Sequence, residues 1–249
     1  NNVISLRDSI QTRWNSGYIA SEQIGPAYKW NSLHWRVKSL DNVGGDTTVL
    51  KLVGIKTNGQ TDTLQTFPTD SMDVLALSNY ADASIYPYIK LVAFMKDNVN
   101  RTSPQLKRWQ VLYEEAPECA INPLKGFVSV NDTLQEGDEV TFRFPIENIG
   151  KHDFTDSLVI TYWIEDPNRN KVPLPQKLKA PPFVPGQTLI DTVKINSYQL
   201  TGSNALWIYV NPLQNSRYQK EQSQFNNVGR YPFKVNKDIT NPLMDVTFD

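Results

Sequence analysis

An alternation of apolar and polar residues within residues 136–150 constrains the fold of this chain more than any other feature. Its apolar positions are two residues apart: Val140, Phe142, Phe144 and Ile146. Successive side chains of an extended strand point to opposite faces, so the apolar side chains share one face and polar ones take the other. Gly137 and Gly150 flank the run, where turns are expected. The segment therefore predicts a half-buried strand of an antiparallel sheet.

Similar strands are expected throughout the first half of the chain. Residues 47–57 and 60–67 are joined by Asn58-Gly59, a pair that tolerates the positive φ of a tight hairpin turn. Further strands are predicted at residues 33–37, 72–77, 88–95 and 106–113. Before them, apolar residues spaced four apart predict a short amphipathic helix within residues 3–18. They are Leu6, Ile10, Trp14 and Tyr18.

The second half repeats the pattern after an aperiodic segment. Residues 114–123 include Pro117 and Pro123 and predict a linker. Strands are then expected at residues 127–130, 140–147, 158–165, 188–195, 205–211 and 230–235, with a shorter, proline-containing edge strand at 171–179. About seven short strands over this length are typical of an immunoglobulin-like sandwich.

We therefore predict an all-β chain with two tandem antiparallel β-sandwich domains. The first, at residues 1–116, is expected to be jelly-roll-like with the N-terminal helix. The second, at residues 121–236, is expected to be immunoglobulin-like, and residues 237–249 to begin a following segment.

Composition narrows the classes of partner. With 39% hydrophobic and 20% charged residues, the chain has the composition of a soluble β-rich protein. A net charge of -1 and scattered Lys and Arg residues argue against nucleic-acid binding. The longest apolar run, residues 91–95, is far shorter than the roughly 20 residues that cross a bilayer, so no membrane insertion is expected. Because the chain starts with Asn1 and has no leader pattern, we expect a mature fragment or an excised segment.

No motif predicts catalysis. The single cysteine, Cys119, excludes an intrachain disulfide, and its only candidate bases, His34 and His152, are expected in different parts of the fold. A glycine-rich phosphate loop, a Gly-x-Ser-x-Gly elbow and a His-Glu-x-x-His helix are all missing from the sequence. We predict no enzymatic activity, no catalytic residues and no cofactor.

Two weaker signals concern ligands. The loops at residues 41–46 and 97–100 are rich in Asp and Asn oxygens that could hold calcium, although hairpin turns need the same residues. Among the six tryptophans, Trp163 is the candidate for stacking on sugars. Its strand neighbours Tyr162 and Ile164 belong to the predicted inward face, which leaves Trp163 outward.

A tripeptide of Asp, then Ser or Thr, then an apolar residue or threonine, recurs along the chain. It resembles the O-glycosylation acceptor motif of exported Bacteroidetes proteins, while the alternative is that Asp and hydroxyl residues end turns before strands. The candidate acceptors are Ser9, Thr47, Thr63, Ser71, Thr133, Ser157 and Thr192.

Longer segments resemble a known group of proteins. Residues 30–35, 86–91 and 102–109 resemble the sandwich region of large Bacteroidetes surface proteins related to gingipain-type cysteine peptidases and to the sortase-like component of type IX secretion. Residues 134–140, 146–150, 226–227 and 241–249 are similar to the adhesion-related CARDB module and the segment after it. The resemblance implies a secreted, cell-surface segment of non-catalytic domains, since the peptidase Cys and His motif has no match here.

We predict a non-catalytic structural and interaction segment of a larger exported bacterial protein, in the extracellular space or at the cell surface. Its expected partners are other domains of the same polypeptide, together with surface proteins or glycans. One alternative is a carbohydrate-binding module in the first domain. The other is a pair of accessory domains that dock onto a peptidase domain.

Overall fold

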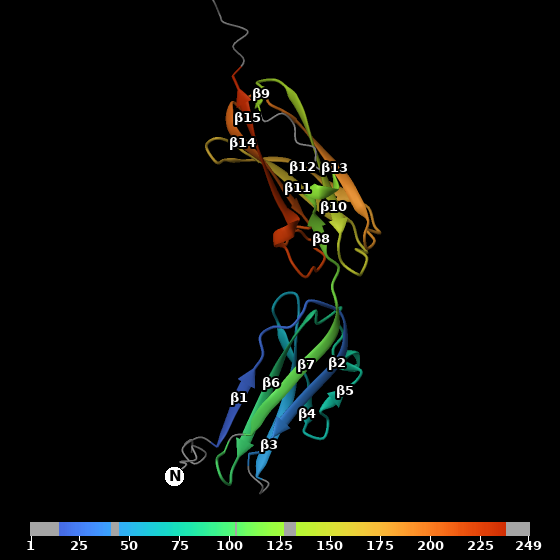
Figure 1. Cartoon of the computed structure of the whole chain (residues 1–249), viewed down its shortest axis with the longest axis vertical. Coiled ribbons are helices and arrows are strands. Elements are labelled where there is room, and N and C mark those ends of the chain that lie inside the picture. The colour runs from blue at the N-terminus through green and yellow to red at the C-terminus, as the bar shows by residue number, and fades with distance from the viewer. Residues whose placement is uncertain (1–14, 41–44, 103, 127–132, 238–249) are drawn as a thin grey trace, which may run out of the picture. The chain divides into compact units, whose positions relative to one another are not determined.

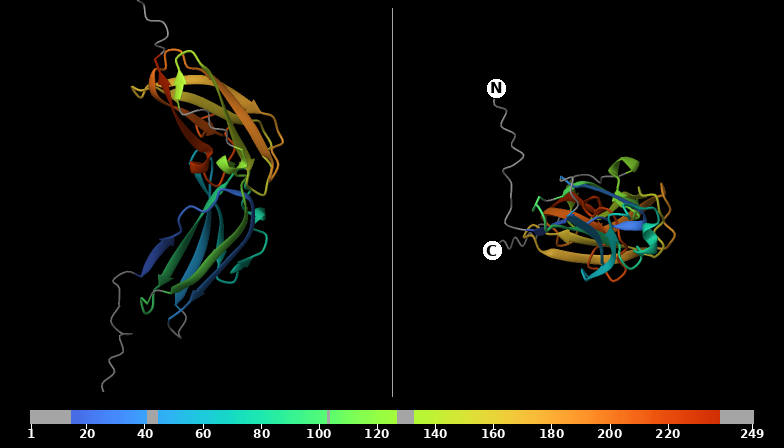
Figure 2. Two further views of the ribbon diagram at one scale, coloured as in Figure 1. Left: turned by 45° about the horizontal axis from the view of Figure 1, so that its top comes forward. Right: turned by 90° about the horizontal axis from the view of Figure 1, so that it is seen from below.

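The computed structural model describes residues 15–40, 45–102, 104–126 and 133–237, and the chain divides into two compact units, Asn1–Ala116 and Pro117–Asp249 (Figure 1). In each unit the strands form two layers, which the further views in Figure 2 show. The only helices among the described residues are three-residue 3-10 turns. The all-β prediction is confirmed. No helix within the described residues is both long enough and apolar enough to cross a membrane.

The first unit contains a four-stranded sheet in the order β1-β6-β3-β4 and a three-stranded sheet in the order β5-β2-β7, both antiparallel. The first sheet is formed by β1 (Ser16–Ala20), β6 (Tyr88–Asp97), β3 (Asp46–Ile55) and β4 (Thr61–Pro68). The second is formed by β5 (Asp73–Val74), β2 (Ala27–Lys38) and β7 (Gln105–Glu115). Trp30 and Trp35 of β2 share one buried core with Leu52 of β3 and Leu91 of β6. The two sheets therefore form a sandwich.

Local sequence explains the turn at residues 58–59 but not the end of the strand expected at residues 72–77. The hairpin between β3 and β4 turns at Asn58-Gly59, with Gly59 at φ 83°, which confirms the prediction. The expected strand at residues 72–77 shortens to β5, because Leu77–Asn79 forms a 3-10 turn that buries Leu77.

The helix expected over residues 3–18 lies mostly outside the described residues. At its C-terminal end the expectation is wrong, because Ser16–Ala20 pairs with β6 as strand β1. The Tyr18 ring packs against Phe94 at 5.0 Å between centroids. Ser16 and Gly17 are poor helix formers, so sheet pairing prevails over the four-residue spacing.

The second unit contains a three-stranded sheet in the order β13-β10-β8 and a five-stranded sheet in the order β12-β11-β14-β15-β9. All pairings are antiparallel except that of β15 with β9. The smaller sheet consists of β13 (Thr188–Asn196), β10 (Glu139–Asn148) and β8 (Cys119–Ile121). The larger consists of β12 (Lys171–Lys179), β11 (Leu158–Glu165), β14 (Gly202–Val210), β15 (Val228–Asn236) and β9 (Thr133–Gln135).

The core of the second unit confirms the alternation in β10. Phe142, Phe144 and Ile146 are buried in one cluster with Tyr162 and Leu206 of the facing sheet. The proline-containing β12 is an edge strand, as predicted. The strand expected at residues 127–130 lies outside the described residues.

The linker expectation is wrong at Cys119–Ile121. These residues form β8, which pairs with β10 from Ile146 to Asn148 and buries Cys119. Three residues are too few to show a periodicity, so only pairing with a distant strand reveals this one.

Candidate functional site

A row of four side chains crosses the outer face of the five-stranded sheet. Trp163 of β11 lies opposite Trp207 of β14, and their rings are parallel within 5° with centroids 5.7 Å apart. The Lys171 Nζ of β12 lies 4.2 Å from the centre of the Trp163 ring, and the Arg230 guanidinium of β15 lies 5.7 Å from that of Trp207. Such stacking of cations on aromatic faces is attractive. We call Lys171, Trp163, Trp207 and Arg230 the cation–aromatic row.

Strand alternation and strand order build this row. In β11 the side chains of Tyr162 and Ile164 enter the core, which leaves Trp163 on the outer face, half-buried. Because β11 and β14 lie between β12 and β15, each tryptophan has its partner ring on one side and a cation on the other. The sequence predicted the outward position of Trp163. The contact with Trp207 depends on the register of two strands far apart in sequence.

Glu165 connects the row to a neighbouring hollow. The Trp207 Nε1–H donates to Glu165 Oε2 at 3.1 Å, and Glu165 Oε1 lies 3.7 Å from Arg230 Nη2. A hollow of about 310 Å³ adjoins these groups, lined by Glu165, Arg230, Ser203 and Lys234 among others. The small Ala205 lies opposite both Glu165 and Pro232 in the sheet register, which leaves room there. Glu165 and Arg230 thus belong both to the surroundings of Trp207 and to the lining of the hollow.

The geometry of the row bears on sugar stacking. A sugar ring packs onto an open aromatic face, whereas each ring of the row already has a second ring and a cation as neighbours. Lys171 would have to leave the Trp163 ring before a sugar could stack there. The sugar role of Trp163 stays a prediction.

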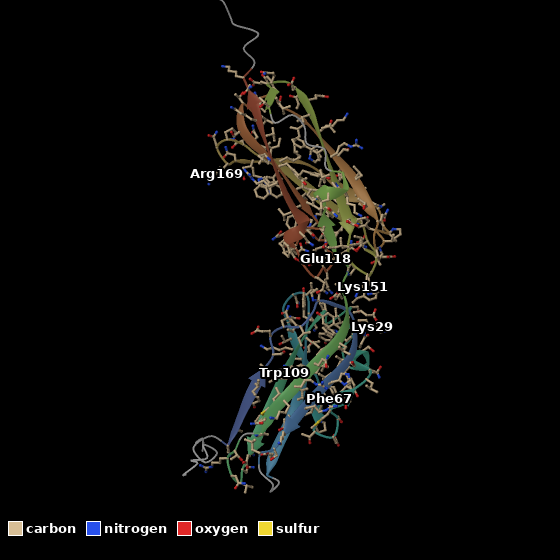
Figure 3. All side chains as sticks on the ribbon, in the orientation of Figure 1. Lys29, Phe67, Trp109, Glu118, Lys151 and Arg169 are labelled. Carbon is tan, nitrogen blue, oxygen red and sulfur yellow. The ribbon has the colours of Figure 1, made fainter. Side chains whose placement is uncertain are left out.

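The tryptophans described in the first unit are less accessible to a ligand than those of the row. Trp30 and Trp35 are 1% and 0% exposed, and each indole N–H donates to a backbone carbonyl at 3.0 Å. Trp109 of β7, labelled in Figure 3, is half-buried and packs against the core. Trp14 lies outside the described residues.

A buried polar network surrounds Glu221 in the second unit. Glu221 is 3% exposed, and its carboxylate accepts from the Cys119 backbone N–H at 3.1 Å and from Asn227 Nδ2 at 3.0 Å. Asn211 Nδ2 and the Cys119 thiol also donate to it. Nearby, Glu118 accepts from Ser223 N and Asn226 Nδ2 (Figure 3 labels Glu118). The network joins β8 to the loop that follows β14.

The electrostatics of this network argue against a reactive thiol. Burial, then the Glu221 charge, raises the pKa of Cys119, so the thiol stays protonated. An activated nucleophile needs the opposite shift and a base within reach. Burial also raises the pKa of Glu221 to about 7, although its hydrogen-bond donors oppose the shift. Nothing in the sequence pattern marked Glu221, because its partners lie six to about one hundred residues away.

Sequence reasoning also missed a chain of Ser32, His34 and Asp73 on the outer face of the three-stranded sheet. His34 Nδ1 lies 2.7 Å from Asp73 Oδ1, and His34 Nε2 lies 3.0 Å from Ser32 Oγ. The order resembles that of serine hydrolases, but Arg36 also donates to both Asp73 oxygens at 2.8 and 2.9 Å. The His34 hydrogen bond, followed by that of Arg36, lowers the pKa of Asp73.

Acyl transfer also needs backbone donors aimed at the oxyanion. The central strand β2 instead pairs with β5 and β7. We assign the Ser32, His34 and Asp73 chain to the support of that sheet face.

The structure places the other candidate residues as follows. In the 97–100 loop, both carboxylate oxygens of Asp97 accept backbone N–H groups, from Val99, Asn100 and Thr102 at 2.8 to 3.1 Å. Most of the 41–46 loop lies outside the described residues. Within the described residues, no three His, Cys, Asp or Glu side chains are grouped to hold a metal ion. Calcium binding stays a prediction.

The candidate glycosylation acceptors are accessible to different degrees. Ser9 lies outside the described residues, and Ser71 and Ser157 are half-buried. Four acceptors are exposed: Thr47, Thr63, Thr133 and Thr192.

No protein-family model matches the sequence, and no curated protein matches it significantly. Similar solved structures include the CARDB domain of PF1109 from Pyrococcus furiosus, crystallised with di-metal ions, at 13% identity and a TM-score of 0.40, covering 51% of this chain and 99% of that one. The solution structure of the same domain is 15% identical with a TM-score of 0.39, and the match covers 49% of this chain and 97% of that one. A β-glucosidase from Listeria innocua in complex with glucose is 16% identical with a TM-score of 0.32, and the match covers 50% of this chain and 17% of that one. At these TM-scores the likenesses indicate no function, and the β-sandwich architecture rests on the strands described above.

Proposed function

We propose that this chain is a non-catalytic interaction segment of a larger exported bacterial protein, and that the cation–aromatic row is its binding surface for an acidic protein segment. The observation that carries the proposal is the row itself: two stacked tryptophans flanked by two cations on a solvent-facing sheet surface. The opposite face of that sheet already forms the core. The row is therefore not needed to close the sandwich.

The chemistry of the row favours a protein over a glycan. Tryptophan and arginine are the residue types that most often dominate the binding energy of protein interfaces. Each ring of the row has the other ring and one cation as neighbours, and the two cationic residues are exposed. Lys171 makes no ion pair within the described residues, so a carboxylate of the partner would complete it. The hollow lined by Glu165 and Arg230 offers space for a partner side chain.

Two features support a role as a segment of an exported protein. Antiparallel sandwiches are held by cross-strand hydrogen bonds and a continuous core, which makes them stiff spacers. The exposed acceptor threonines and the resemblance to Bacteroidetes surface proteins support export to the cell surface. Docking onto a neighbouring peptidase domain would be one form of the proposed interaction.

An array test separates protein binding from glycan binding. The whole chain is applied to acidic, neutral and basic aromatic-containing peptides and, separately, to a glycan array. We expect acidic peptides to bind, and Trp207→Ala or Arg230→Ala to weaken that binding by about ten-fold or more. Leu213→Ala, at an exposed position of the second unit outside the row, is the matched control.

Two outcomes would overturn the proposal. One is peptide binding that neither substitution changes. The other is binding to glycans alone that disappears in Trp163→Ala, which would establish the carbohydrate-binding alternative for this sheet.

A further inference from the structure

The β1 edge of the first unit lacks the features that usually prevent strands from pairing with other chains. Its residues, Ser16–Ala20, include neither a charge nor a proline. The longer edge strands do: β12 carries three lysines and two prolines, β7 carries Lys107 and Arg108, and β4 ends at Pro68. Two three-residue edge strands, β8 and β9, also lack both, so β1 is the longest described edge without them. Because lysine and proline at sheet edges oppose pairing with further strands, β1 is the edge best suited to a partner strand.

The hydrogen-bond pattern shows which backbone groups of β1 are free to pair. Asp97 N donates to Asn15 O, and Ser21 N donates to Leu91 O, both at 2.9 Å. The odd-numbered residues therefore face β6. In an antiparallel strand the backbone groups of successive residues point alternately toward one neighbour and away from it. Ser16, Tyr18 and Ala20 therefore direct their N–H and C=O groups away from β6.

The side chains along this edge have complementary shapes. Gly17 and Ile19 lie opposite the buried Met95 and Ala93, so both positions face the inside of the sandwich. Ile19 is nevertheless 46% exposed. Among the described residues, and apart from Gly17 and its two chain neighbours, no atom lies within 4 Å of the point where a Cβ of Gly17 would be. A cavity of about 220 Å³, lined by Gly17, Ile19 and Met95 among others, adjoins that point.

We propose that β1 pairs antiparallel with β1 of a second copy of this chain, about a two-fold axis at Tyr18. Tyr18 then faces Tyr18 of the partner copy, and Ser16 faces Ala20 of the partner copy. The outward backbone groups form two hydrogen bonds at each of three pairs, about six in all. Ile19 of each copy faces Gly17 of the other and fills the cavity there. The two four-stranded sheets become one continuous sheet with an isologous interface.

The charges at the two ends of the edge favour the antiparallel direction. Lys96 lies beside Ser16 in the sheet, and Arg101 lines the cavity at the same end. Glu22, which is exposed, follows the other end. None of the three makes an ion pair within the described residues. Antiparallel pairing brings the acidic end of each copy toward the basic end of the other, whereas parallel pairing would place like charges together.

Cysteine cross-linking tests the register directly. On the two-fold axis, Tyr18→Cys places two thiols opposite each other, so mild oxidation of the full chain is expected to give a disulfide-linked dimer. Ser16→Cys is the matched control, since Ser16 faces Ala20 of the partner copy and its own thiols stay apart. The wild-type chain shows the background level of cross-linking, which should be low because its one cysteine, Cys119, is buried. Equal cross-linking of the two variants would overturn the register.

Sedimentation tests the association itself. The wild-type chain is expected to reach twice the mass of a single chain as concentration rises, and Ile19→Lys to remain monomeric by placing a charge against Gly17 of the partner copy. Leu75→Lys, an exposed apolar position away from β1, is expected to dimerise like the wild type. Lys96→Glu should weaken the dimer and the further change Glu22→Lys should restore it.

Two results would refute the two-fold pairing. One is a wild-type chain that stays monomeric up to millimolar concentration. The other is dimerisation that appears only after residues 1–14 are removed, which would mean that the chain covers this edge itself.

Discussion

The two sandwiches share an architecture but differ in the side chains that they bury. In the first unit the large buried side chains of β2 are Trp30 and Trp35, whose indole N–H groups each meet one backbone carbonyl. In the second unit a carboxylate, Glu221, is buried with Asn211 and Asn227 around it. Apolar packing responds to changes in volume, whereas a buried carboxylate also responds to pH. The first unit also buries a carboxylate, Asp97, but there the effect of burial is outweighed by hydrogen bonds from Val99, Thr102 and Asn100, which lower its pKa. Burial instead raises the pKa of Glu221. The two units should therefore respond differently to pH.

The largest effect is expected from Trp35→Ala. Removing a fully buried indole leaves a cavity and an unpaired Ser71 carbonyl, which should lower the free energy of unfolding of the first unit by about 3–5 kcal/mol. Denaturant titration followed by fluorescence measures the change. Trp109→Ala, at a half-buried position, serves as the control and should lower the free energy of unfolding by less. An equal loss in the second unit would contradict the separation of the two cores.

The next largest effect is a pH dependence of the free energy of unfolding of the second unit. The Glu221 carboxyl ordinarily releases its proton near 4.5 but holds it to about 7 in the fold. Between these values the folded state binds more protons than the unfolded state, so the free energy of unfolding falls as pH rises, by a total on the order of 3 kcal/mol.

Denaturant midpoints of the second unit between pH 4.5 and pH 7 check this dependence. Carboxyls with lowered pKa values, such as Asp73 and Glu147, lose their contributions below this window. A second unit that gains stability across the window would show that the donors around Glu221 outweigh its burial.

Glu221→Gln should remove that pH dependence and also destabilise the second unit at neutral pH. All four neighbours donate to the carboxylate, so either orientation of the new amide directs its NH2 group at another donor. The expected cost is about 1–3 kcal/mol. Calorimetry at several pH values measures both effects. Glu165→Gln, on the outer face of the same unit, is the control that should keep the pH slope.

A smaller effect is expected in the cation–aromatic row. Lys171→Ala removes the cation above the Trp163 ring and should lower the stability of the second unit by about 0.5–1 kcal/mol. The same change exposes one face of that ring. Lys179→Ala, on the same strand, is the matched control, and a loss of similar size there would mean that the stacking contact is not the cause.

The smallest expected effect is that of calcium on the first unit. Asp97 already uses both carboxylate oxygens for N–H groups of its own loop, so calcium should leave the melting temperature unchanged. Thermal unfolding with calcium and with chelator measures this. A rise with calcium that Asp97→Asn removes would instead establish a site.

What the sequence determined by itself was local. The two-residue alternation in residues 140–146 predicted a strand and its buried face, Asn58-Gly59 predicted a hairpin, and the neighbours of Trp163 predicted its outward position. Each rests on backbone geometry over a few residues. Tyr18 shows the limit, because its helical spacing was overridden by pairing with β6.

Tertiary structure decided which distant residues meet. The contact of Trp163 with Trp207, the enclosure of Glu221, and the pairing that turns Cys119–Ile121 into β8 all join segments far apart in the chain. Such contacts follow from strand order and register. These depend on how whole sheets bury their apolar faces, so no short window of sequence contains them.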